Sequence, residues 1–210
     1  MTTYITFVLD ETGSMSSCKE ETIAGFNSYI KELKSELKDV KFSFVKFDSE
    51  EINWVYRDVD LLFVKKLSDK NYSPRSMTPL WDAFGLAVKD MEKKNLKKDD
   101  KIIITVLTDG LENASTEFTA NSIAKMILEH KDWAINFLGA NMDAWGDVGR
   151  TLGMSKRSTY TFDQSDMSGT FNAVGVSTVA YAKGETTVDT FYNDNNLNMG
   201  ELENFDSEPE

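Results

Sequence analysis

The sequence is poor in cysteine and histidine, with one of each, Cys18 and His130, among 210 residues. A single cysteine excludes a disulfide within the chain, and a single histidine excludes a zinc site built from several histidines. No apolar run approaches the roughly 18 residues that a membrane-spanning helix needs. The first residues also lack the basic segment and the long apolar stretch of a signal peptide, so we expect a soluble, cytoplasmic protein with no membrane partner.

Basic residues are also scarce, because 23 lysines and arginines face 35 aspartates and glutamates, a formal net charge of −12. Much of the excess lies in residues 184–210, which carry eight acidic side chains and no Lys or Arg. We therefore predict one folded domain over residues 1–183 and an acidic, flexible tail over residues 184–210. Lys and Arg cluster only over residues 93–98. This argues against nucleic acid as a partner, since phosphate contacts need clustered basic side chains.

Short apolar segments alternate with segments of helical periodicity along the chain. Residues 4–9, 102–107 and 133–138 are largely apolar runs, typical of strands buried on both faces. Further strands are predicted as a pair around a turn, 41–47 and 52–56, and as a last short strand, 159–162. The helix candidates are 20–37, 80–91, 120–130, 143–152 and 169–181. Such alternation predicts an α/β fold with a central, mostly parallel sheet and helices on both faces.

Polar side chains follow the predicted strands, at the edge of the sheet where ligands bind in parallel α/β proteins. Asp10, Thr12 and Ser14 come directly after the first strand, and Asp109 follows the strongest one. Thr78 stands before a proline at the predicted start of a helix. The set offers oxygen atoms alone, and oxygen ligands suit a hard divalent cation such as magnesium, calcium or manganese.

Three motifs occur in a fixed order: D-x-T-x-S at residues 10–14, T-P-L at 78–80 and T-D-G at 108–110. Together they resemble the metal-ion-dependent adhesion site (MIDAS) of von Willebrand factor type A (vWA) domains. The resemblance covers residues 3–181, and the stretch L-G-A-N at 138–141 with the small-residue helix at 173–182 is similar to intracellular bacterial and phage members. It implies a Rossmann-like vWA fold with one antiparallel edge strand, in a bacterial cell or a phage-infected host.

The resemblance also implies a role for each motif residue. Thr12, Ser14 and Thr78 are expected as direct hydroxyl ligands, and Asp10 and Asp109 as ligands that bind directly or through water. The expected ion is Mg²⁺, with Mn²⁺ or Ca²⁺ as alternatives. A partner protein would then fill the open position with an Asp or Glu side chain. Thr12 departs from the serine that is usual in the family, which keeps the oxygen and adds a methyl group.

Other interpretations of the same residues stay open. Each motif alone also describes a turn or a helix cap, although that interpretation has to explain three motifs in order. The stretch D-E-T-G at residues 10–13 resembles the phosphorylation motif of haloacid-dehalogenase-like enzymes, which would make the chain a magnesium-dependent phosphotransferase or hydrolase with Asp10 as nucleophile. Soluble phosphatases of that family need a second Asp where this chain has Thr12. A third alternative is a structural assembly protein that binds through its acidic tail. We expect a protein-binding module and no enzyme.

Residues beside the motifs receive no ligand role. We expect Glu112 and Asn113 in a solvated loop, with contact to the rim of the site as the other interpretation. Residues 141–143 follow a predicted strand, where they could shape specificity, although a helix cap at Asn141 explains them equally well. Neither the oligomeric state nor the identity of the partner follows from the sequence.

Overall fold

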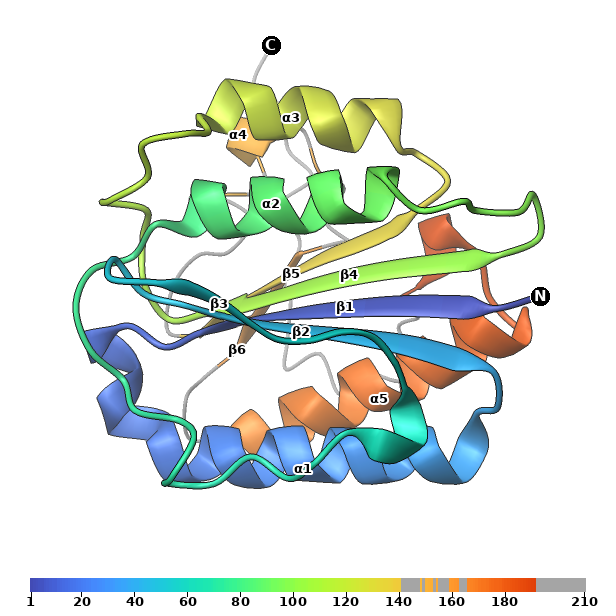
Figure 1. Ribbon diagram of the computed structural model, residues 1–210, viewed down its shortest axis with the longest axis horizontal. Coiled ribbons are helices and arrows are strands. Elements are labelled where there is room, and N and C mark those ends of the chain that lie inside the picture. The colour runs from blue at the N-terminus through green and yellow to red at the C-terminus, as the bar shows by residue number, and fades with distance from the viewer. Residues whose placement is uncertain (141–147, 149, 153, 155–158, 163–165, 192–210) are drawn as a thin grey trace, which may run out of the picture.

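A computed structural model describes residues 1–140, 148, 150–152, 154, 159–162 and 166–191. These residues form a six-stranded sheet between two layers of helices (Figure 1). The strands are β1 (Thr3–Asp10), β2 (Val40–Phe47), β3 (Ile52–Asp60), β4 (Lys101–Thr108), β5 (Ala134–Ala140) and β6 (Thr159–Phe162), in the order β3-β2-β1-β4-β5-β6. Within this sheet β3, at one edge, is the antiparallel strand, and the other strands run parallel. The predicted mostly parallel sheet with one antiparallel edge strand is confirmed.

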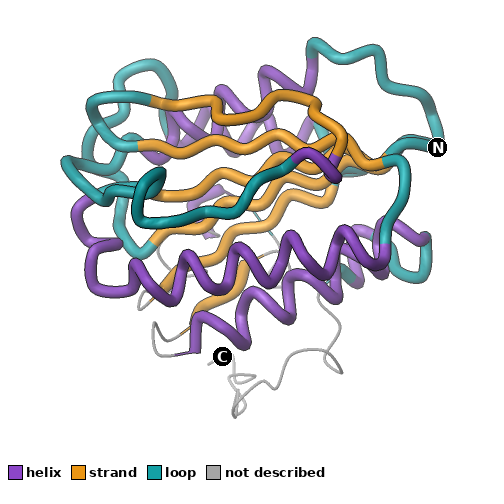
Figure 2. Tube along the Cα trace, turned by 60° about the horizontal axis from the view of Figure 1, so that its bottom comes forward, coloured by secondary structure: helices purple, strands orange, loops and turns teal. Residues whose placement is uncertain are grey.

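Helices cover both faces of the sheet. On one face α1 (Lys19–Glu36) and α5 (Met167–Lys183) lie side by side (Figure 2), and α2 (Leu80–Glu92) and α3 (Ala120–Glu129) cover the other. The shorter elements are α4 (Arg150–Leu152) and the 3₁₀ helices η1 (Gly13–Cys18), η2 (Leu61–Phe63) and η6 (Val188–Thr190). Of the predicted helix 143–152, most lies outside the described residues. In the part of the chain that the structure describes, no helix is long and apolar enough to cross a membrane.

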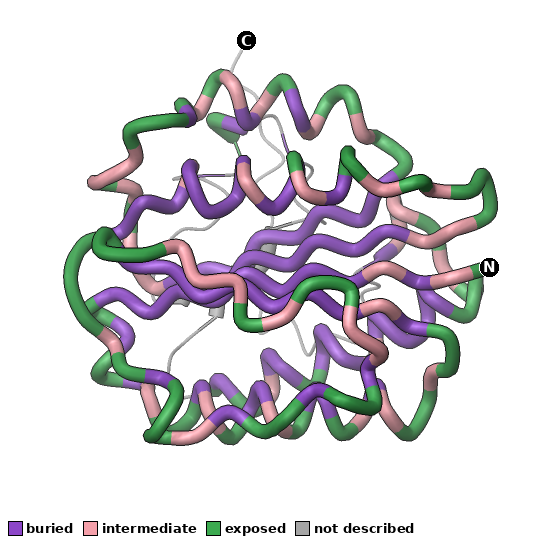
Figure 3. The backbone as a smooth tube through the Cα atoms, in the orientation of Figure 1, coloured by how far each residue is buried: buried purple, intermediate pink, exposed green. Residues whose placement is uncertain are grey.

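The central strands are buried on both faces (Figure 3), which explains their nearly continuous apolar sequences. In β1, Phe7 packs toward α1 and α5, whereas Val8 packs toward α2. The Phe7 ring centroid lies 5.6 Å from that of Phe26 in α1 and 6.0 Å from that of Phe171 in α5. Close packing on both sides fixes the positions of β1 and β4, and therefore the places where these two strands end.

The described chain continues past α5. Gly184 ends this helix in the left-handed backbone conformation, with φ of 76°, and η6 follows. The side chain of Phe191 is 2% exposed, and its ring centroid lies 5.6 Å from that of Tyr181. Residues 184–191 of the predicted tail therefore end in a buried aromatic side chain. Residues 192–210 lie outside the described residues, and a flexible acidic tail there stays a prediction.

Candidate metal site at the carboxyl edge of the sheet

Segments far apart in the sequence meet at the carboxyl ends of β1 and β4. Asp10 is the last residue of β1, and Asp109 directly follows β4, the parallel neighbour of β1. The Ser14 hydroxyl donates a hydrogen bond to Asp109 Oδ1 at 2.5 Å. Thr12 Oγ1 lies 3.2 Å from Ser14 Oγ. The hydroxyls of the first motif are thus linked to each other and to the carboxylate that follows the neighbouring strand.

Thr78 approaches this group from the start of α2. A Cβ atom added to Gly110 would lie 3.3 Å from Thr78 Oγ1 and 3.4 Å from Ser14 Oγ. Both hydroxyl oxygens therefore border the same small space beside Gly110, which any larger residue would occupy. The structure brings the predicted residues together, although they come from three separate segments.

Asp10 is fully buried, and both of its carboxylate oxygens accept hydrogen bonds. The Thr12 N–H donates to Oδ1 at 2.6 Å, and the Thr108 hydroxyl donates to Oδ2. Burial raises the pKa of Asp10 to about 7, the hydrogen bonds from Thr108 and Thr12 lower it, and the charge of Asp109 raises it further. A buried carboxylate of this kind is unfavourable as an anion unless an opposite charge lies close by. A cation would supply that charge.

Residues 112 and 113 hold the segment that carries Thr78. Asn113 Oδ1 accepts the Thr78 N–H at 2.8 Å, and the Asn113 N–H donates to the Thr78 carbonyl at 3.1 Å. The Glu112 carboxylate accepts the Trp81 N–H at 2.9 Å and two N–H groups of its own loop. Asn113 is exposed, as expected of a solvated loop. Asn113 therefore contacts the site residue Thr78, whereas Glu112 contacts Trp81 and its own loop.

Asp82, in the first turn of α2, fastens the remainder of the loop that follows β4. Its carboxylate accepts the N–H groups of Thr116, Glu117 and Phe118 at 2.8, 2.9 and 2.7 Å. The residue is 7% exposed. This contact could not be predicted from the sequence. The available signal was an acidic residue in a first helical turn, which does not identify donors more than thirty residues further along the chain.

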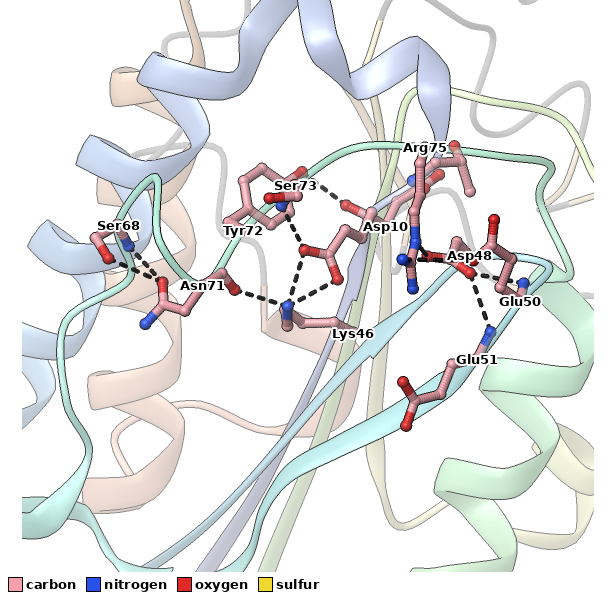
Figure 4. Close-up of polar contacts among 12 residues, drawn as sticks. Asp10, Lys46, Asp48, Glu50, Glu51, Ser68, Asn71, Tyr72, Ser73 and Arg75 are labelled. Atoms are coloured by element: carbon pink, nitrogen blue, oxygen red, sulfur yellow. Dashed lines mark hydrogen bonds and ion pairs between the residues drawn. The ribbon is translucent and has the colours of Figure 1, made fainter.

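The loop before Thr78 runs along the first motif. The Arg75 N–H donates to the Glu11 carbonyl at 2.8 Å, and the Gly13 N–H donates to the Ser76 carbonyl at 3.1 Å. The Tyr72 hydroxyl donates at 2.7 Å to the carbonyl of the last residue of β1 (Figure 4). Main-chain bonds therefore fasten the hydroxyl-bearing motif to the segment that leads into α2. The sequence contained no signal for this pairing.

The donor set fits a hard divalent cation. Three hydroxyls and two carboxylates offer oxygen atoms, the ligands that magnesium, calcium and manganese prefer. Within the described residues, no group of three or more His, Cys, Asp or Glu side chains could hold a metal ion. A cation at this edge would therefore depend on the hydroxyl oxygens of Thr12, Ser14 and Thr78. Two of these border the space beside Gly110.

No protein-family model matches the sequence, and no curated protein matches it either. Solved structures do match. The vWF domain of the type V pili tip protein Mfa5 from Porphyromonas gingivalis is 11% identical, with a TM-score of 0.64 over 86% of this chain and 96% of that chain. This chain has the vWA fold. The fold predicted from the motifs is confirmed.

Two other proteins share the vWA fold over part of their length. Proximal thread matrix protein 1 from the mussel byssus is 14% identical, with a TM-score of 0.63, and the match covers 86% of this chain and 46% of that one. The pilus adhesin SpaC from Lactobacillus rhamnosus GG is 12% identical, with a TM-score of 0.65 over 86% of this chain and 30% of that one. This chain therefore spans less than half the length of either. A further structure of the mussel protein has a zinc-occupied MIDAS motif.

Residues 141–143 lie outside the described residues, so both interpretations of them, a role in specificity and a helix cap, stay open. The described site therefore consists of Asp10, Thr12, Ser14, Thr78 and Asp109 with the residues that hold them.

Proposed function

We propose that this chain is a metal-dependent protein-binding module. Thr12, Ser14 and Thr78, with Asp10 and Asp109, would hold a divalent cation, Mg²⁺ first and Mn²⁺ or Ca²⁺ as alternatives. The ion would capture an Asp or Glu side chain of a partner protein. The observation that carries the proposal is that the Ser14 and Thr78 hydroxyl oxygens border the same space beside Gly110. Thr12 Oγ1 and Asp109 Oδ1 both lie within 3.2 Å of the Ser14 oxygen. The zinc-occupied MIDAS motif of the mussel protein, which has the same fold, supports it.

The charges of the site explain why a partner carboxylate would be needed. Two carboxylates belong to the donor set, and both oxygens of Asp10 already accept hydrogen bonds from the protein. Asp109 accepts one from Ser14. Mg²⁺ usually keeps several waters, and where its direct protein ligands are mainly neutral hydroxyls, an anionic side chain of a partner can replace one of these waters. We therefore infer that an acidic side chain of the partner completes the coordination.

Exposed apolar side chains beside the site support a protein as the partner. Met77 precedes Thr78 and is 56% exposed, and Leu111 follows Gly110 and is 55% exposed. The segments that carry them are joined by the hydrogen bonds of Asn113 with Thr78. Protein interfaces combine apolar contacts with polar ones, and exposed apolar side chains next to polar groups take part in them. A partner with an apolar residue beside its acidic one fits this surface.

A binding role is also favoured over phosphoryl transfer by the position of Asp10. A nucleophilic aspartate has to reach the phosphorus atom, but Asp10 is 0% exposed and both of its oxygens are engaged. We therefore propose no catalytic role for it. A cytoplasmic location and a bacterial or phage origin stay predictions.

Calorimetric titration of Mg²⁺, Mn²⁺ and Ca²⁺ into the chelator-treated full chain tests the proposal. The variants are Ser14→Ala and Asp109→Asn, with Ser35→Ala as control, because Ser35 is an exposed serine whose hydroxyl bonds within α1. We expect saturable binding to the wild type and the control, and affinity at least tenfold lower in the two site variants. Equal affinity in Ser14→Ala, or no binding to the wild type, would contradict the proposal.

A further inference from the structure

A buried ion pair joins the first motif to β2. The Lys46 ammonium group, from β2, is 2.8 Å from Glu11 Oε1 and 2.7 Å from Glu11 Oε2. The two side chains are 10% and 11% exposed. Glu11 stands between the site residues Asp10 and Thr12, yet its carboxylate is directed to this lysine. Its charge is therefore neutralised within the pair and adds little to the negative charge of the site.

Both members of the pair also bind the loop that precedes Thr78. The Lys46 ammonium donates to the Asn71 carbonyl at 2.7 Å, and the Ser73 N–H donates to Glu11 Oε1 at 2.6 Å. Figure 4 shows the main-chain carbonyl of Asn71 joined to the Lys46 ammonium group, while the Asn71 side chain turns to Ser68. The pair therefore joins the end of β1, β2 and the loop 71–76 through side-chain bonds.

A second contact secures the far end of the same loop. The Arg75 guanidinium donates to Asp48 Oδ2 at 2.7 Å, next to the turn that joins β2 and β3 (Figure 4). Ser76 then takes a positive φ of 59°, two residues before Thr78. The loop is thus held at both ends, and its last residues determine the direction in which the chain enters the site.

We propose that the Glu11–Lys46 ion pair positions the metal site by locking loop 71–76 against residues 11–13. The proposal rests on the proposed function. The contacts of the ion pair with the loop would hold Thr78 at the distance from Thr12 and Ser14 that a shared cation requires. Glu11 and Lys46 are positioning residues in this arrangement and bind neither the metal nor the partner.

Replacement of the pair by apolar residues would separate its positioning role from its contribution to stability. Removing two charges from water is costly, and apolar residues of similar volume often replace a buried ion pair without loss of stability. An apolar pair could fill the same space behind the motif. It could not accept the Ser73 N–H or donate to the Asn71 carbonyl, so the loop would lose these two contacts. Its other bonds to residues 10–13 and the Arg75–Asp48 contact would remain. A folded protein with a loosened loop is the expected result.

The test uses the full-length double variant Glu11→Leu/Lys46→Met, which removes both charges and keeps the local net charge unchanged. Three quantities are measured: the unfolding midpoint in urea, amide hydrogen exchange at residues 71–76, and Mg²⁺ affinity by calorimetry. We expect a folded protein, faster exchange over 71–76 and Mg²⁺ affinity at least tenfold lower than in the wild type. The variant Glu11→Gln/Lys46→Met keeps an acceptor for the Ser73 N–H, so its affinity and exchange should fall between those of the other two proteins.

A matched control removes a different partly buried ion pair. In Asp90→Leu/Lys94→Met the 2.8 Å pair of these two residues is lost, with side chains 17% and 10% exposed. The contacts of Lys94 with Asp58 and of Asp90 with Arg57 are lost with it. We expect wild-type Mg²⁺ affinity and wild-type exchange at residues 71–76 in this control.

Wild-type affinity or wild-type exchange in the folded Glu11→Leu/Lys46→Met variant would overturn the positioning role. If that variant does not fold, the same result in Glu11→Gln/Lys46→Met overturns it. Absence of Mg²⁺ binding to the wild type would instead overturn the proposed function.

Discussion

Ser14 and Asp109 lie ninety-five residues apart in the sequence and share a hydrogen bond of 2.5 Å. The bond connects the turn after β1 to the turn after β4, because these two strands are parallel neighbours and end at the same edge of the sheet. The hydroxyl of Ser14 is also 3.2 Å from Thr12 Oγ1. One short contact therefore joins two motifs that the sequence separates, and it locates the candidate metal site.

Gly110 is predicted to keep the site open. Its backbone does not have a positive φ, so alanine fits the backbone, but the added Cβ would lie 3.3 Å from Thr78 Oγ1 and 3.4 Å from Ser14 Oγ. We expect Gly110→Ala to lower Mg²⁺ affinity about tenfold, or about 1.4 kcal/mol, with little change in the urea midpoint. Calorimetry and urea unfolding measure the two effects.

The control for this prediction is Gly13→Ala. A Cβ there would meet its nearest neighbour, the Ser76 carbonyl oxygen, at 3.5 Å, an ordinary contact distance. It should leave Mg²⁺ affinity closer to that of the wild type. The same affinity loss in both variants would mean that the space beside Gly110 has no special role.

Asp10 is predicted to make the metal-free protein less stable as the pH rises. Burial raises the pKa of Asp10 from 3.8 to about 7, so between these values the folded protein keeps a proton that the unfolded chain has lost. The contribution of this residue to stability is therefore present in full below about pH 4 and is lost as the pH rises to about 7. The loss is of the order of a few kcal/mol.

Urea unfolding of Asp10→Asn beside the wild type, both with chelator, isolates this effect from other carboxylates. We expect the stability of the wild type relative to the variant to fall between pH 4.5 and pH 7.5 and to level off above. A constant difference across this range would show that Asp10 titrates near its ordinary pKa. Addition of Mg²⁺ at pH 7.5 should stabilise the wild type and leave the variant nearly unchanged.

The fold could be predicted because its central strands are buried on both faces. Strands such as β1 and β4 need apolar residues on both sides, so they read as nearly continuous apolar runs in the sequence. Asp10 and Asp109 could be found because each stands directly after such a run. The edge strand β3 was harder to delimit. The pattern predicted 52–56, but the strand continues to Asp60. The last residues were missed because an irregular register opposite residues 42–45 and a positive φ at Asp58 interrupt the alternation of apolar and polar side chains.

The residues that hold the site could not be predicted in the same way. Asp82 and Glu112 act on backbone N–H groups more than thirty positions away, and Lys46 acts on a glutamate 35 positions away. Such pairs leave no periodic pattern and no local motif, because a single acidic or basic residue is ordinary on any surface. They become visible only when the elements that carry them are placed side by side.

Leu111 is predicted to contribute to partner binding and not to metal binding. It is 55% exposed beside Gly110, so an apolar residue next to the acidic side chain of a partner could cover it. Burial of this leucine would raise the affinity for the partner about tenfold. Leu128, equally exposed at 55% on α3, is the matched control. Peptides selected from a displayed random library against the wild type in Mg²⁺ should combine Asp or Glu with a large apolar neighbour. A selected peptide should bind Leu111→Ser about tenfold more weakly than Leu128→Ser, with equal Mg²⁺ affinity in both variants. Equal peptide binding would exclude Leu111 from the interface, because the two substitutions remove the same apolar side chain.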